Sequence, residues 1–123
     1  MTLTVAQLLA LADSGALHAV AEAAIPAATG WRLQRLPAAL GPELQRATAA
    51  RFALLTDDNS VSVGHLQRRL NAGREGEYLA ALQPLLAETV EIAAAPLDRA
   101  GIEGARFTAA QLAALEPILD SAL

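Results

Sequence analysis

The sequence predicts a mainly α-helical single domain over residues 1–123. We expect a kinked antiparallel helical hairpin or a small bundle, with short flanking helices and at most a minimal two-stranded β ribbon. The length suits one domain. The chain is 54% hydrophobic but only 3% aromatic, so most of its apolar residues are Ala and Leu, which are strong helix formers. Leucines also recur at helical spacing along the longest apolar stretch.

The N-terminal segment has the pattern of a capped helix. Thr4 and Gln7 stand at the spacing of a capping box, in which two side chains satisfy free backbone amides at a helix start. This pattern predicts a helix from Val5 to Ala12. A second short helix is expected from Ala16 to Ala24, after the break at Ser14-Gly15.

The stretch from Pro26 to Leu55 carries the clearest helical stripe. Its apolar positions step by three or four residues, which places them on one face of a helix. Pro37 predicts a kink, and Gly41 is the alternative point for a break, because proline inside a helix removes a hydrogen bond. The continuity of the stripe favours one kinked rod. The stripe consists of Leu33, Leu36, Leu40, Leu44 and Ala47.

Two short alternating segments predict the β ribbon. Val61–Val63 and Val90–Ile92 each alternate in polarity, and we expect them to pair with one another. Between them, His65–Leu70 predicts a short helical turn. A longer helix is expected from Arg74 to Thr89, with a kink at Pro84.

The C-terminal part is predicted to be a loop followed by one helix. Glycines and proline make Pro96–Phe107 loop-like. Thr108 and Gln111 repeat the capping-box pattern before a helix from Ala109 to Leu115. Pro117 is expected to bend the chain after it.

Composition excludes several classes of function. A net charge of −4 argues against a nucleic-acid partner, which normally meets a basic surface. The absence of Cys excludes disulfides, thiolate catalysis and Cys-ligated zinc. No apolar stretch approaches the length of a membrane span, and the N-terminus lacks the basic start of a signal peptide. We therefore expect no membrane association.

Two polar groupings are candidates for a catalytic or a metal site. Asp13, Ser14, His18 and Glu22 offer an acid, a base and a nucleophile, but a surface helix with a polar pair four residues apart explains them better. His65 with the acidic segment Asp57–Asn59 lacks the spacing of a calcium loop and has no second His nearby. A solvated turn is the better interpretation.

A third grouping combines glycines with arginine. The segment Gly101–Gly104 is flanked by Arg99 and Arg106, but it matches neither a P-loop nor a dinucleotide-binding pattern. The sequence therefore predicts no enzyme, no cofactor and no metal.

The predicted partner surface centres on the only Trp. Trp and Arg are enriched at interface hot spots, although a place in the core is the alternative for Trp31. Ala-lined helix faces bury little area each, which favours completion of the core by a protein partner or by self-association. The expected contact residues are Trp31, Leu33, Arg35, Leu36, Leu40 and Leu44.

The order of motifs resembles a family of small uncharacterised proteins of tailed bacteriophages and prophages. The shared layout is a long helix containing ELQRATAARFALL, then DDNSVSV, a helix ending LLAETVEI, and finally FTAAQLAALEPIL. The resemblance implies a non-enzymatic role in virion structure or assembly, in the bacterial cytoplasm or in the phage particle. The alternative is a small regulatory binder that inhibits or modulates a host protein.

Overall fold

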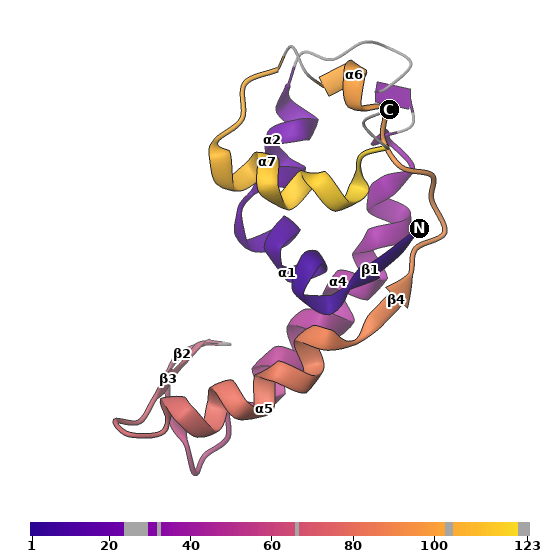
Figure 1. Cartoon of the computed structure of the whole chain (residues 1–123). Helices are drawn as coiled ribbons and strands as arrows, with labels where there is room; N and C mark the ends of the chain where they lie inside the picture. Colours follow the sequence, from indigo (N-terminus) through magenta and orange to yellow (C-terminus); the bar gives the residue numbers. More distant parts are fainter. Residues whose placement is uncertain (24–29, 32, 66, 103–104, 121–123) are drawn as a thin grey trace.

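The structure is a computed structural model that describes residues 1–23, 30–31, 33–65, 67–102 and 105–120 (Figure 1). It confirms a mainly α-helical chain. The helices are α1 (Val5–Asp13), α2 (Ala16–Glu22), α4 (Leu36–Ala53), α5 (Glu75–Ala87), α6 (Arg99–Ile102), α7 (Ala109–Leu115) and a 3₁₀ turn (Glu116–Ile118). The strands are β1 (Thr2–Thr4), β2 (Ser60–Gly64), β3 (Gln67–Leu70) and β4 (Thr89–Glu91).

Both predicted capping boxes are confirmed. The Thr4 hydroxyl accepts a hydrogen bond from the Gln7 amide at 3.1 Å, and the Gln7 side chain accepts one from the Thr4 amide at 2.9 Å. Thr108 and Gln111 form the same reciprocal pair at 3.1 and 3.0 Å. Because these bonds are local, they define the starts of α1 and α7 without help from the rest of the fold.

The predicted kinked rod is corrected by the structure. The chain is helical at Leu33, turns at Gln34 and Arg35, and begins α4 at Leu36. Pro37 therefore lies in the first turn of α4, where a missing amide proton costs nothing, and it does not kink a continuous helix. Helix α4 also runs through Gly41 without a break. The predicted start at Pro26 and the predicted end of the second helix at Ala24 lie outside the described residues.

The predicted pairing of the two valine-rich segments is wrong. Strand β2 pairs antiparallel with β3, so that Val61 lies opposite Arg69. The segment expected to form a helical turn at His65–Leu70 thus supplies a strand instead. Strand β4 pairs with β1, with Leu3 opposite Val90. The β2–β3 ribbon closes over a short turn, which costs little loop entropy.

The core lies in the globular part of the molecule, called the head below, formed by β1, β4, α1, α2, α6, α7 and the N-terminal half of α4. Its members are apolar side chains brought together from both ends of the sequence. They are Leu3, Leu8, Leu11, Ala16, Val20, Leu36, Leu40, Ile92, Leu97, Ile102, Ala114, Leu115 and Ile118. A smaller cluster of Val5, Leu9 and Ala47 packs against Leu85 and Leu86 of α5.

The C-terminal half of α4 and helix α5 extend from the head as an arm, with the β2–β3 ribbon at its far end (Figure 1). Helix α5 contains no buried residue, and its contact with the rest of the molecule is concentrated in the smaller cluster. The arm therefore exposes far more helix surface than the head does. None of the described helices is long and apolar enough to span a membrane.

Candidate protein-binding surface

The structure divides the predicted contact residues into two groups. Leu36 and Leu40 are only 1% and 0% exposed, so they belong to the core and present almost no surface to a partner. Leu33 and Leu44 are half-buried, whereas Trp31 and Arg35 are exposed. The leucine stripe is not one continuous exposed surface, because Leu36 and Leu40 in its middle pack into the head.

Trp31 lies on the surface, with 63% of its area exposed, and not in the core. The guanidinium carbon of Arg35 lies 5.7 Å from the centre of the indole ring. This is the geometry of a cation–π contact, which at exposed sites contributes about 0.5–1 kcal/mol. The pair forms a locally ordered, solvent-facing group at the N-terminal end of α4.

Three apolar hollows follow one another along α4. The first lies beside Trp31, Leu33 and Pro37. The second, about 310 Å³, lies between α2 and α4 and extends from Pro37 to Leu44. The third, about 520 Å³, begins at Leu44 and follows the arm. Since neighbouring hollows share Pro37 and Leu44, they form one continuous surface.

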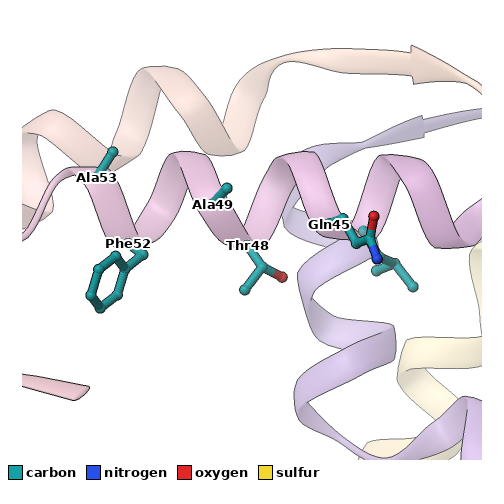
Figure 2. A pocket seen from close by; sticks show the side chains of 6 residues that line it. Gln45, Thr48, Ala49, Phe52 and Ala53 are labelled. Atoms are coloured by element: carbon teal, nitrogen blue, oxygen red, sulfur yellow. The ribbon is translucent and has the colours of Figure 1, made fainter. Parts of the chain in front are cut away.

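The third hollow is lined by α4 alone (Figure 2). Phe52 and Thr48 project from the side of α4 turned away from α5, as Figure 2 shows. All the lining residues are uncharged, and we call them the α4 face. They are Leu44, Gln45, Thr48, Ala49, Phe52 and Ala53.

The charged residues of α4 lie on its other half and interact within the chain. Glu43 accepts a hydrogen bond from Arg46 at 3.0 Å. Arg51 donates two hydrogen bonds to the Asp13 carboxylate, at 2.8 and 3.2 Å, and these bonds raise the pKa of Arg51. At 100° per residue, the three charged positions of α4 span an arc of only about 140°. The spacing of these three charged residues is visible in the sequence, although the leucine stripe is the more prominent pattern.

Two acidic members of the polar groupings considered for catalysis are paired with arginine in the structure. Asp13 is held by Arg51, and Asp57 pairs with Arg68 at 2.9 Å. His18 lines the second hollow, and His65 is exposed in the turn between β2 and β3. Within the described ranges, no three His, Cys, Asp or Glu side chains are grouped to hold a metal ion.

The glycine-containing segment adjoins Arg99, whose hydrogen bonds hold the C-terminal end of the described chain. Gly101 is buried in α6, whereas Glu103 and Gly104 lie outside the described residues. Arg99 donates a hydrogen bond to Glu116 at 3.0 Å and another to the Asp120 carbonyl oxygen at 3.1 Å. Arg99 therefore ties the end of the described chain to the head.

These contacts of Arg99 predict that the C-terminal segment is held less firmly at acidic pH. The hydrogen bond from Arg99 lowers the pKa of Glu116 in the folded chain. Its stabilising effect is therefore complete above the unfolded pKa, which is about 4.3, and is lost as pH falls through the lower folded pKa. We expect the protection of the Leu119 and Asp120 amides, measured against the intrinsic exchange rate at each pH, to fall in that range.

Glu116→Gln should remove this pH dependence of protection and leave low protection at neutral pH. Glu77→Gln, at an exposed ion pair on α5, is the matched control. Unchanged exchange at Asp120 in Glu116→Gln would show that the Arg99 contact does not hold this segment. Nuclear magnetic resonance between pH 3 and 7 gives the measurement.

Comparison of the chain with protein-family models, with curated proteins and with solved structures finds no match.

Proposed function

We propose that this chain is a non-enzymatic structural or assembly protein of a phage or prophage that acts through protein–protein contacts. In this proposal α4 and α5 act as an antiparallel helical hairpin that presents the α4 face. The observation that carries the proposal is the uncharged, exposed half of α4. The motif layout supports the phage origin.

The α4 face differs from an ordinary solvent-facing helix surface. Surface helices usually direct charged and polar residues toward water. The central parts of protein interfaces are instead depleted of charge and contain aromatic residues. The α4 face has Phe52 near one end, and the apolar surface continues past Pro37 to Trp31 at the other. An apolar surface of this extent is typical of a binding site.

A second candidate function is regulation of a host protein. It is favoured by Trp31 and Arg35, because both residue types are enriched at hot spots and the pair is already ordered before binding. In that function the Trp31 end of the surface would make the main contact, and a single host protein would be the partner.

Affinity capture with matched variants tests the proposal. Ala49→Glu places a charge on the α4 face, whereas Ala80→Glu places one on the exposed surface of α5. The wild-type chain and Ala80→Glu should retain a virion structural or assembly protein from phage-producing cells in stoichiometric amounts. Ala49→Glu should lose at least about tenfold in affinity, because an unpaired carboxylate would be buried.

The identity of the captured protein separates the two functions. Stoichiometric capture of one host protein, with loss of binding in Trp31→Ala, would replace the assembly role by the regulatory one. Equal capture of a phage protein by all variants would place the binding surface elsewhere and contradict the role of the α4 face.

A further inference from the structure

The geometry of α4 points to a particular partner, a second copy of this chain. We propose that two chains pair through their α4 faces, antiparallel, around a two-fold axis near the middle of the helix. This inference rests on the proposed function, because it requires the α4 face to be a protein contact. It adds the identity of one occupant and the register of the contact.

Gly41 leaves open space beside α4 in which a neighbour can approach closely. It lies inside α4, where glycine is destabilising relative to alanine. Apart from its own chain neighbours, a β-carbon built at Gly41 would meet no atom within 4 Å, so the space beside it is open. Pro42 follows inside α4, and its ring also favours a residue without a β-carbon at this position. The open space beside Gly41 admits the close approach of another helix.

The register follows from the midpoint of α4. Helix α4 runs from Leu36 to Ala53, so its centre lies between Leu44 and Gln45. An antiparallel two-fold arrangement then places Thr48 opposite Gly41 of the second copy and Phe52 opposite its Pro37. Pro37 borders the apolar hollow between α2 and α4, which is about 310 Å³. The Phe52 ring of each copy would therefore enter a hollow of the other.

The charges at the two ends of α4 match this arrangement. Arg35 immediately precedes the helix, and Asp58 lies in the turn that follows it. Among the described residues, neither side chain has an ion-pair partner within 4 Å, although Asp57 is paired with Arg68. In this register Arg35 of each copy lies opposite Leu54, four residues before Asp58 of the other, so the two charged side chains lie at the same end of the pair. Self-pairing thus joins opposite charges at both ends and neutral residues between them.

Light scattering after size exclusion tests whether the purified chain self-associates. At about 100 µM we expect a mass near twice 12.7 kDa for the wild-type chain and for Ala80→Glu. Ala49→Glu and Gly41→Leu should shift the mass to that of one chain. Because a β-carbon before Pro42 disfavours the helix, the helix content of Gly41→Leu is measured alongside by circular dichroism. A dimer lost only through unfolding of α4 would show as a loss of helix content.

Charge exchange tests the register. Arg35→Glu or Asp58→Arg should each weaken dimerisation about tenfold, because each replaces two attractions by two repulsions. The double variant restores opposite charges and should recover the wild-type dissociation constant. Since the chain has no Cys, Gln45→Cys should also give a disulfide-linked dimer on oxidation, whereas Ala80→Cys should not.

Three results would overturn this inference. They are a wild-type mass of one chain up to about 1 mM, a dimer that persists in both Ala49→Glu and Gly41→Leu, and a double charge variant that stays as weak as the single ones. A monomer that binds a phage protein through the α4 face would remove self-association only. The proposed function fails separately, when no partner of either kind uses that face.

Discussion

Leu40→Ala is expected to lower the free energy of unfolding by about 3 kcal/mol, within the usual range for a fully buried leucine. Leu40 is 0% exposed and packs in the main cluster of the head, although the sequence suggested a partner contact there. Removing its side chain leaves a cavity that the surrounding helices cannot fill completely. Chemical denaturation followed by circular dichroism gives the change in free energy.

The control for this variant is an exposed leucine in the same region. Leu112 on α7 is 49% exposed, and Leu112→Ala should change stability by less than about 0.5 kcal/mol. If Leu40→Ala kept wild-type stability and impaired only association, Leu40 would be a contact residue and the core described above would be wrong.

Leu9→Ala is expected to release α5 from the head before the rest of the molecule unfolds. Leu9 is 3% exposed and belongs to the small cluster that packs against Leu85 and Leu86. Because α5 has no buried residue of its own, this cluster is its main apolar anchor. We expect a loss of about 2–4 kcal/mol in the protection of α5 amides, measured by hydrogen exchange.

Leu115→Ala provides the comparison, because Leu115 is buried in the main cluster. It should lower protection throughout the head, including α7, whereas Leu9→Ala should leave α7 amides comparatively protected. Equal loss of protection in α5 and α7 for Leu9→Ala would show that arm and head unfold as one cooperative unit.

Leu40→Ala and Leu9→Ala bear on function because they change the packing of the folded chain and leave its exposed surface unchanged. The α4 face belongs to the same helix as Leu40, but most of its residues are exposed. These are Gln45, Thr48, Ala49 and Ala53. Substitutions in the core should therefore reduce binding only through loss of folded protein. Substitutions such as Ala49→Glu should reduce binding while the melting temperature is preserved.

Local features of the fold were predictable from the sequence. The capping boxes at Thr4 and Thr108 and the turn at Gly15 act between neighbouring residues. The predicted helix from Arg74 to Thr89 is likewise found, as α5 over Glu75–Ala87. The mainly helical class followed from the abundance of Ala and Leu, since intrinsic propensity needs no tertiary information.

The strand pairing was not predictable in the same way. Val61–Val63 and Val90–Ile92 have similar patterns, and short alternating segments do not specify their partners. Strand β4 pairs with β1 because α5 returns the chain to the head, next to the N-terminus (Figure 1). Such a pairing depends on how the helices pack.

The candidate site shows the same division between sequence and tertiary structure. By itself the sequence determined a mainly α-helical chain, the capped starts of α1 and α7, and the uncharged half of α4, through propensity and spacing. The packing of α4 against the head decided that Leu36 and Leu40 are buried while Trp31 and Phe52 border an open surface. Helical periodicity defines a face, but only the neighbouring elements decide whether that face meets the core or the solvent.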